Sequence, residues 1–133
     1  METVYPEATF GCLQCWPDSA DVAWEARKHL VGASELIDES HFHVMILSCS
    51  KCSQQFLSVF TESIDWVGGE DPQYWTTLPL TAPEAADLVG RSGTSETDFA
   101  SFGQGRRSLR HDFPKDELPR NYWGKGILIG PHD

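Results

Sequence analysis

The sequence lacks any long apolar segment and has few cysteines. Its longest apolar run, Val44–Leu47, is far shorter than the roughly 20 residues that a membrane-spanning helix needs. The first seven residues are acidic and hold no apolar stretch of the kind found in secretory signals. Four cysteines in 133 residues are too few for a disulfide-rich secreted mini-protein. We therefore expect a soluble cytoplasmic domain with no membrane partner.

Basic side chains are also scarce. The chain has 10 lysines and arginines against 20 aspartates and glutamates, a formal net charge of −10. The deficit lies in residues 1–90, which hold three basic and fourteen acidic side chains. An acidic body repels phosphate and so disfavours nucleic acid as a partner, whereas it attracts basic proteins. An acidic surface also keeps many small proteins soluble without any partner, and this alternative stays open.

The first half of the chain predicts one helix. Asp18 or Ser19 can cap its start after Pro17, and Gly32 supplies a stop, so the segment 18–31 should be helical. Its core-facing stripe would consist of apolar residues at four-residue spacing, namely Val22, Ala26 and Leu30.

Strands are predicted in the centre of the chain. The segments 42–48 and 55–65 are rich in β-branched and aromatic residues and should form a hairpin with 49–52 at its tip. A third strand is predicted over 74–80. Thr81 and Glu84 then form a capping-box pattern that opens a short helix ending near Val89. Together these elements predict an α+β fold in which two or three helices flank an antiparallel sheet.

The last third of the chain changes in composition. Residues 90–105 are rich in Gly, Ser and Thr, which predicts a mobile loop. Residues 121–130 regain strand character, and we expect them to dock back on the body because they would otherwise form an exposed apolar patch. The length suits one domain, so we expect residues 1–133 to form a single unit.

All four cysteines fall into two Cys-x-x-Cys pairs, Cys12/Cys15 and Cys49/Cys52, with 33 residues between them. Four thiolates complete the tetrahedral shell of a structural zinc ion, and disulfides are disfavoured in the cytoplasm. The alternative is a thiol redox protein. A redox pair of the thioredoxin kind should begin a helix, whereas Trp16 and Pro17 follow the first pair. We therefore expect Zn²⁺ as a structural cofactor.

The two pairs and their surroundings resemble the zinc-ribbon class. Phe10 precedes Cys12 by two positions and Phe56 follows Cys52 by four, in keeping with zinc-ribbon knuckles. The resemblance covers residues 9–16 and 42–66. It departs from the usual pattern at Ser53, where glycine often stands, and in a spacer that contains a whole helix. The resemblance implies a metal site but no particular activity, because such folds serve many functions.

Two histidines lie shortly before the second cysteine pair. His41 or His43 could replace a cysteine as a metal ligand or act as a catalytic base. With four cysteines present, we expect instead that they alternate with Phe42 on a strand. A closed shell of four thiolates does not activate water, and the sequence shows no phosphate loop, nucleophile elbow or deaminase motif. We therefore expect no enzymatic activity.

A surface for a partner is predicted after the second strand. There, carboxylates surround a Gly-Gly loop bracketed by aromatic residues, a mixture that suits an interface with a basic protein. The residues are Asp65, Trp66, Glu70, Asp71, Tyr74 and Trp75. The aromatic residues could equally close the core beneath a solvated turn.

Three hypotheses about function follow from these features. The first is a non-catalytic zinc protein that binds another protein through its acidic surface, such as an immunity or inhibitor protein that neutralises a basic toxin. The second is a nucleic-acid or transcription-associated accessory protein with its contacts at Arg106, Arg107, Arg110 and Lys115. The third is the thiol redox protein. Oligomeric state is open in all three.

Overall fold

Six strands form one antiparallel sheet in which each strand pairs with the next, in the order β1-β2-β3-β4-β5-β6. A computed structural model describes residues 10–90, 99 and 102–132. The strands are β1 (Val31–Glu39), β2 (Phe42–Ser48), β3 (Gln55–Glu62), β4 (Gln73–Leu80), β5 (Arg107–Phe113) and β6 (Arg120–Lys125). The helices are α1 (Ala20–Arg27) and α2 (Ala82–Gly90). The fold is mixed α+β, with two helices assigned in this part of the chain.

The predicted hairpin and third strand are present. β2 and β3 pair along their whole lengths with the second cysteine pair in the turn between them, and β4 adds to β3. The helix α2 starts with the predicted capping box. Thr81 N donates to Glu84 Oε1 at 2.8 Å, and Glu84 N donates to Thr81 Oγ1 at 3.3 Å. These bonds satisfy N–H groups that a helix start otherwise leaves without a partner.

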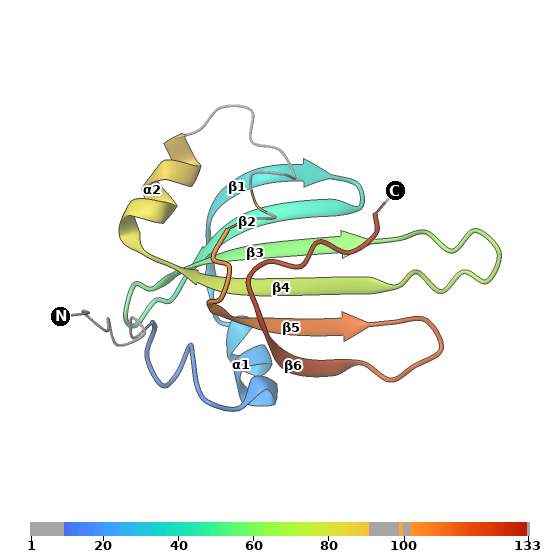
Figure 1. Cartoon of the computed structure of the whole chain (residues 1–133), viewed down its shortest axis with the longest axis horizontal. Coiled ribbons are helices and arrows are strands. Elements are labelled where there is room, and N and C mark those ends of the chain that lie inside the picture. Colours follow the sequence, from blue (N-terminus) through green and yellow to red (C-terminus); the bar gives the residue numbers. More distant parts are fainter. Residues whose placement is uncertain (1–9, 91–98, 100–101, 133) are drawn as a thin grey trace.

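The main core lies on the side of the sheet that α2 covers. Alternate strand residues point to opposite faces, and we call this side, which includes Val44 of β2 and Val59 of β3, the α2 face. Leu88 of α2 and Phe99 are fully buried against it. The segment after β6 runs back across this side of the sheet (Figure 1), where Ile127 and Ile129 pack against the same core.

The opposite side, which we call the α1 face, includes Leu47 of β2 and Phe56 of β3. It carries α1, because Arg27 Nη2 donates to Ser58 Oγ at 2.7 Å and Arg27 Nε donates to Thr77 Oγ1 at 3.3 Å. The two helices therefore lie on opposite faces of one sheet.

The helix α1 is shorter than predicted and rotated about its axis. It ends at Arg27, and Val22, predicted to face the core, is 54% exposed, whereas Ala23 is 1% exposed. The stripe that faces the sheet contains Ala23, Trp24 and Arg27. The Trp24 ring stacks on His111, and the Arg27 guanidinium donates to hydroxyl groups of β3 and β4, contacts that the Val22 side chain could not make. The predicted cap is confirmed at Ser19, whose Oγ accepts from Val22 N at 3.3 Å.

Two strands were not expected from the sequence. β1 is an edge strand with mostly exposed side chains and two register shifts against β2. β5 is the basic stretch that follows the predicted mobile loop at 90–105. Of that loop, only Gly90, residue 99 and residues 102–105 lie within the described part of the chain. In the described part, no helix is long and apolar enough to cross a membrane.

Candidate metal centre

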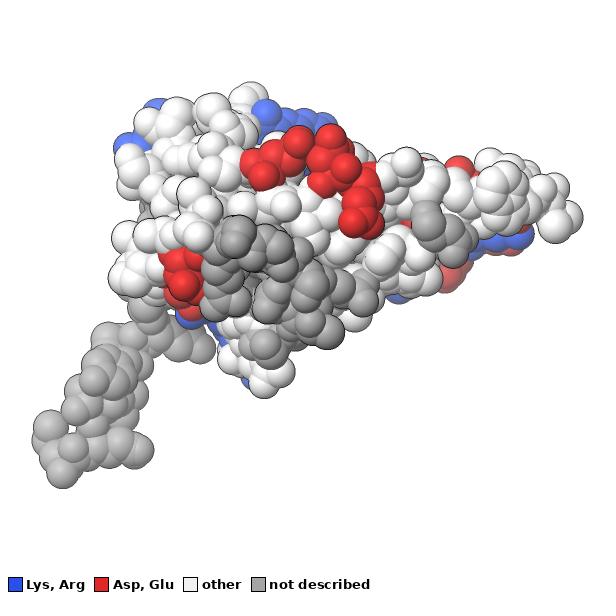
Figure 2. Space-filling model, turned by 90° about the horizontal axis from the view of Figure 1, so that it is seen from above, with Lys and Arg blue, Asp and Glu red and all other residues white. Residues whose placement is uncertain are grey.

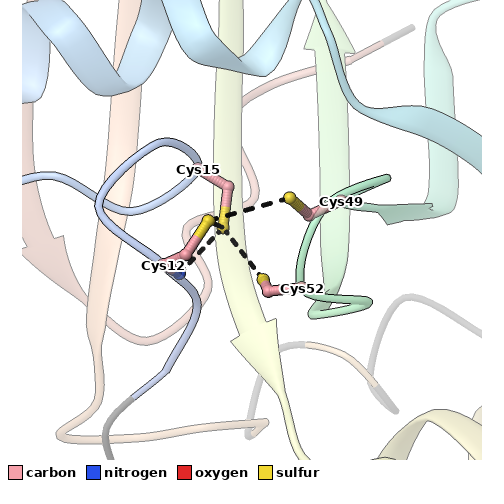
Figure 3. A group of neighbouring side chains, drawn as sticks. All are labelled: Cys12, Cys15, Cys49 and Cys52. Carbon is pink, nitrogen blue, oxygen red and sulfur yellow. Dashed lines mark hydrogen bonds between the residues drawn. The ribbon is translucent and has the colours of Figure 1, made fainter.

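Four cysteine sulfurs meet at one end of the sheet (Figure 3). Cys12 and Cys15 come from the turn before α1, Cys49 and Cys52 from the β2–β3 turn, and all four Sγ atoms lie within 4.8 Å of one another. The Sγ–Sγ distances are 3.6 Å for Cys12–Cys15, 4.0 Å for Cys12–Cys49 and 3.7 Å for Cys15–Cys52. Four sulfurs at about 2.3 Å from a zinc ion would stand about 3.8 Å apart. The donors fit one tetrahedral ion, as in a zinc-ribbon-like site.

The β2–β3 turn folds tightly around its two cysteines. Cys49 N donates to Gln54 O and Ser53 N donates to Cys49 O, both at 2.9 Å. Ser53 has a φ of 67°, the left-handed conformation that favours glycine. Ser53, which the sequence analysis noted as a departure from the zinc-ribbon pattern, therefore occupies the turn position where that pattern often has glycine.

The first cysteine pair lies in an irregular turn and not on a hairpin. Trp16 N donates to Cys12 O at 2.8 Å and closes the turn. Gly11 precedes it with a φ of 68°, and a Cβ there would lie 2.8 Å from Trp16 Cβ and 2.9 Å from Cys15 Sγ. Only glycine fits this position, since both the backbone conformation and the space exclude a side chain.

Backbone N–H groups support the sulfurs. Cys12 N donates to Cys15 Sγ at 3.2 Å, and Lys51 N donates to Cys49 Sγ at 3.4 Å. Hydrogen bonding from the backbone N–H of Cys15 lowers the pKa of Cys12 to about 7, whereas burial raises the pKa of Cys15 and of Cys52. A metal ion would remove the protons from all of these thiols.

One residue outside the cysteine motifs ties the two turns together. Gln54 Oε1 accepts from Gly11 N at 2.9 Å, and Gln54 Nε2 donates to the carbonyls of Gln55 and Leu80, both at 2.7 Å. The sequence analysis missed this role. The available signal is the position of Gln54, two residues after Cys52, but polar residues are common in turns and carry no specific prediction.

Aromatic and apolar residues pack around the sulfurs. Phe56, singled out by the zinc-ribbon pattern, is fully buried in a cluster with Cys15, Cys49 and Leu47. Trp16 covers this cluster, with its ring centroid 5.4 Å from that of Phe56. Phe10 has a different neighbour, because the guanidinium of Arg106 lies 4.8 Å from the centre of its ring.

The two histidines lie away from the sulfurs and pair with carboxylates. His41 Nδ1 lies 3.0 Å from Glu62 Oε1, and His43 Nδ1 lies 3.1 Å from Asp38 Oδ1. Within the described residues, the group of potential ligands placed to hold an ion consists of the four cysteines. The side-chain hydrogen bond from Gln73 keeps the pKa of Glu62 below its usual value, and His41 adds to this effect.

Two of the residues predicted to contact a partner are engaged within the β3–β4 turn. Asp65 Oδ1 accepts from the N–H groups of Val67 and Gly68, and Asp65 Oδ2 lies 2.7 Å from Lys115 Nζ. The hydrogen bond from Lys115, with help from the Gly68 N–H, lowers the pKa of Asp65 to about 2. Asp71 Oδ1 accepts from Asp65 N at 2.8 Å. Both carboxylates thus help to shape the turn.

The other four predicted residues are not brought to one patch. Trp66 is 85% exposed, and Glu70 is exposed in the same turn. Tyr74 lies on the α2 face, where a Cβ on Gly130 would come within 3.0 Å of its ring. Trp75 lies on the α1 face, because successive strand residues point to opposite sides.

Comparison with protein-family models finds no match to this chain, and searches of curated proteins and of solved structures find none either.

Proposed function

We propose that this chain is a non-catalytic zinc protein that binds a basic protein through its acidic surface. The observation that carries the proposal is an open groove of about 620 Å³ between the β3–β4 and β5–β6 turns. Five carboxylates and one lysine line it: Glu62, Glu70, Asp71, Asp116, Glu117 and Lys115. Such an excess of negative charge in a concave surface attracts lysine and arginine side chains and speeds their association.

The turns that form the groove also carry exposed apolar side chains. Trp66 is 85% exposed, Val67 98% and Leu118 86%. Large apolar groups beside charged ones are the usual composition of the energetically important part of an interface. These three side chains would supply buried contact area, while the carboxylates would select a basic partner.

The metal in this proposal is structural. The residues that would hold it are Cys12, Cys15, Cys49 and Cys52, and four thiolates leave no open position for substrate or water. The ion would join the turn before α1 to the β2–β3 turn. The same four-sulfur arrangement favours a metal centre over a dithiol redox pair, because each sulfur has neighbours from the other pair.

The arginines considered for nucleic-acid binding have partners inside the fold. Arg106 Nη1 lies 2.8 Å from Glu84 Oε1, and Arg110 Nη2 donates to the carbonyl of Lys125 at 2.8 Å. Arg107 stacks 3.9 Å from the ring centre of Trp123. These contacts support a protein partner over a nucleic acid, since phosphate binding needs cations that are free to displace counterions.

A pair of charge-reversal variants tests the proposal. Glu70→Lys with Asp116→Lys changes the groove, whereas Glu35→Lys with Glu39→Lys makes the same charge change on the acidic β1 edge, which Figure 2 views directly. Each tagged protein is incubated with lysate of its native cells at low salt, and bound proteins are identified by mass spectrometry.

We expect a basic protein to be retained by the wild type and by the β1-edge variant but lost by the groove variant. Retention by the groove variant, or no stable partner for any form, would contradict the proposal. An inhibitor of a basic toxin is one role that this size and charge suit. Inhibition of the captured protein's own activity by the purified chain would identify that role.

A further inference from the structure

Four aromatic side chains form a row across the α1 face. The strand register places His43, Phe60, Trp75 and His111 next to one another on β2, β3, β4 and β5. Neighbouring ring centroids lie 5.6 Å, 4.8 Å and 5.2 Å apart along the row. We call these four residues the aromatic row.

The helix α1 covers one end of the aromatic row and leaves the other open. Trp24 stacks on His111 with ring centroids 3.8 Å apart and meets the edge of Trp75 at 5.5 Å. At the other end, the side chain of His43 is 36% exposed. Phe60 and Trp75, which lie between His43 and His111 in the row, are half-buried.

On this face, the fold itself places arginines over tryptophans. The guanidinium carbon of Arg27 lies 5.3 Å from the ring centre of Trp24, and that of Arg107 lies 3.9 Å from Trp123. Among the residues that the structure describes, no arginine or lysine lies over Phe60 or Trp75. Phe60 and Trp75 are aromatic, like the rings that contact a guanidinium elsewhere on this face, but no arginine of the described residues makes such a cation–π contact with them.

The charges next to the row are mainly negative. Glu62 follows Phe60 by two residues, so it points to the same side of β3, and it also lines the acidic groove. Asp38 contacts His43 at the open end. A cation borders the middle of the row, because Arg27 donates to Ser58 and Thr77, the cross-strand pair next to Phe60 and Trp75 on this face. The row therefore adjoins the groove through Glu62, and Arg27 borders the row on the other side.

We propose that Phe60 and Trp75 bind the guanidinium of an arginine in the basic partner, while neighbouring basic residues of the same segment enter the groove. This inference rests on the proposed function and adds the identity of the recognised side chain. A guanidinium is planar and stacks on a ring while its N–H groups remain available to a carboxylate such as Glu62. A lysine ammonium is more strongly hydrated and gains less. The surface should therefore prefer arginine to lysine, which groove charge alone would not do.

Two peptides of equal charge test this preference. In one peptide four arginines alternate with glycine, and in the other four lysines alternate with glycine. Both peptides have blocked termini. Each is titrated into the zinc-loaded full chain, and the dissociation constant and the tryptophan indole N–H signals are measured by fluorescence and NMR. The variants are Trp75→Leu, the ring-conserving Trp75→Phe, and the control Val89→Ala, an exposed apolar position on α2 on the opposite face of the sheet.

We expect the wild type to bind the arginine peptide about three- to tenfold more tightly than the lysine peptide. Trp75→Leu should abolish this preference, Trp75→Phe should keep part of it, and Val89→Ala should keep all of it. NMR spectra of Trp75→Leu and of Trp75→Phe check that each variant keeps the fold, so that a loss in Trp75→Leu alone reports on the ring. Equal affinity of the wild type for both peptides would overturn the inference, as would displacement of the arginine peptide by a neutral oligosaccharide or by single-stranded DNA.

The two proposals can fail separately. If both peptides bind equally and the groove variant loses them, the acidic surface binds basic segments but the row selects nothing. If the arginine preference holds while the groove variant keeps its cellular partner, the row recognises arginine but the proposed function is wrong.

Discussion

Removal of the metal from the four-cysteine centre should destabilise the α1 face first. Phe56 is 0% exposed and Leu47 8% exposed, and both pack in one cluster with Cys15 and Cys49. If the turn before α1 detaches, the cover of these two apolar side chains is lost. Burial of each contributes about 1.5–3 kcal/mol, so chelation should lower the free energy of unfolding by about 3–6 kcal/mol. At about 4 °C per kcal/mol for a domain of this size, the melting temperature should fall by about 12–24 °C.

The sulfur geometry also predicts how the metal-free state titrates. The Sγ atoms of Cys15 and Cys52 lie 3.7 Å apart, and two thiolates at that distance repel by about 4–5 kcal/mol at an effective dielectric constant of about 20. Burial independently raises the pKa of Cys15. The metal-free protein should therefore keep protons on most of these thiols and release them when zinc binds. Zinc affinity should weaken as the pH falls, because protons then compete with the ion.

Calorimetry of the zinc-loaded and the chelated protein measures the fall in melting temperature, and elemental analysis checks the metal content of each sample. Hydrogen exchange should become faster in residues 11–30 and 49–53, whereas the central strands around Val59 should stay protected by the α2-face core. A metal-free preparation that melts at the same temperature as the loaded one, with unchanged exchange around Cys12, would refute this reasoning.

Two glycines with left-handed backbones form a matched pair. Gly11→Ala places a Cβ 2.9 Å from Cys15 Sγ, whereas Gly69→Ala meets nothing within 4 Å. The left-handed backbone alone should make Gly69→Ala cost about 1–2 kcal/mol of stability. Gly11→Ala should cost more because of the close contact, and only this variant should weaken zinc binding in a chelator competition. Glu84→Gln should cost about 1–2 kcal/mol in urea unfolding, because it weakens both the capping box and the pair with Arg106. Lys115→Met should raise the pKa of Asp65 from about 2, as seen by carboxyl NMR. In the wild type the stabilisation from this depressed pKa is present above about pH 4 and is lost as the pH falls toward 2. Equal zinc affinity of the two glycine variants would contradict the argument about Gly11. An unchanged urea midpoint for Glu84→Gln would contradict the argument about the capping box and the Arg106 pair. An unchanged Asp65 titration in Lys115→Met would contradict the argument about this ion pair.

The metal ligands can be predicted from the sequence because Cys-x-x-Cys spacing is local: two sulfurs three residues apart can reach one ion in any tight turn. The hairpin around Cys49 follows from the same local pattern of apolar strands and a turn. The orientation of α1 cannot be predicted this way. Val22 and Trp24 both belong to plausible helical stripes, and the choice between them is made by His111, which lies far away in sequence.

The two missed strands show a similar limit. β1 is an edge strand with exposed side chains and register shifts that break the period-two pattern. β5 buries polar residues, including Ser108 at 0% and Asp112 at 4% exposure. Partners from β6 satisfy Asp112, because Arg120 and Tyr122 both donate to its carboxylate. Such partners are known only once the strands are paired, so local composition alone reads as a basic loop.

The candidate metal centre and the proposed partner surface lie at opposite ends of the same strand. β3 runs from the cysteine turn to the groove over Gln55–Glu62, eight residues at about 3.3 Å each, or roughly 25 Å. This exceeds the screening length of about 8 Å at physiological salt, so a zinc centre with four thiolates and the carboxylates of the groove do not destabilise each other. What connects them is α1. A helix of eight residues is too short to be stable alone in water, and its anchors are the metal-held turn before it and the strand pairing of β1 after it. By fixing α1, a bound ion would help to hold Trp24 against His111, which closes one end of the aromatic row. A metal with no part in binding can in this way determine which rings a partner meets.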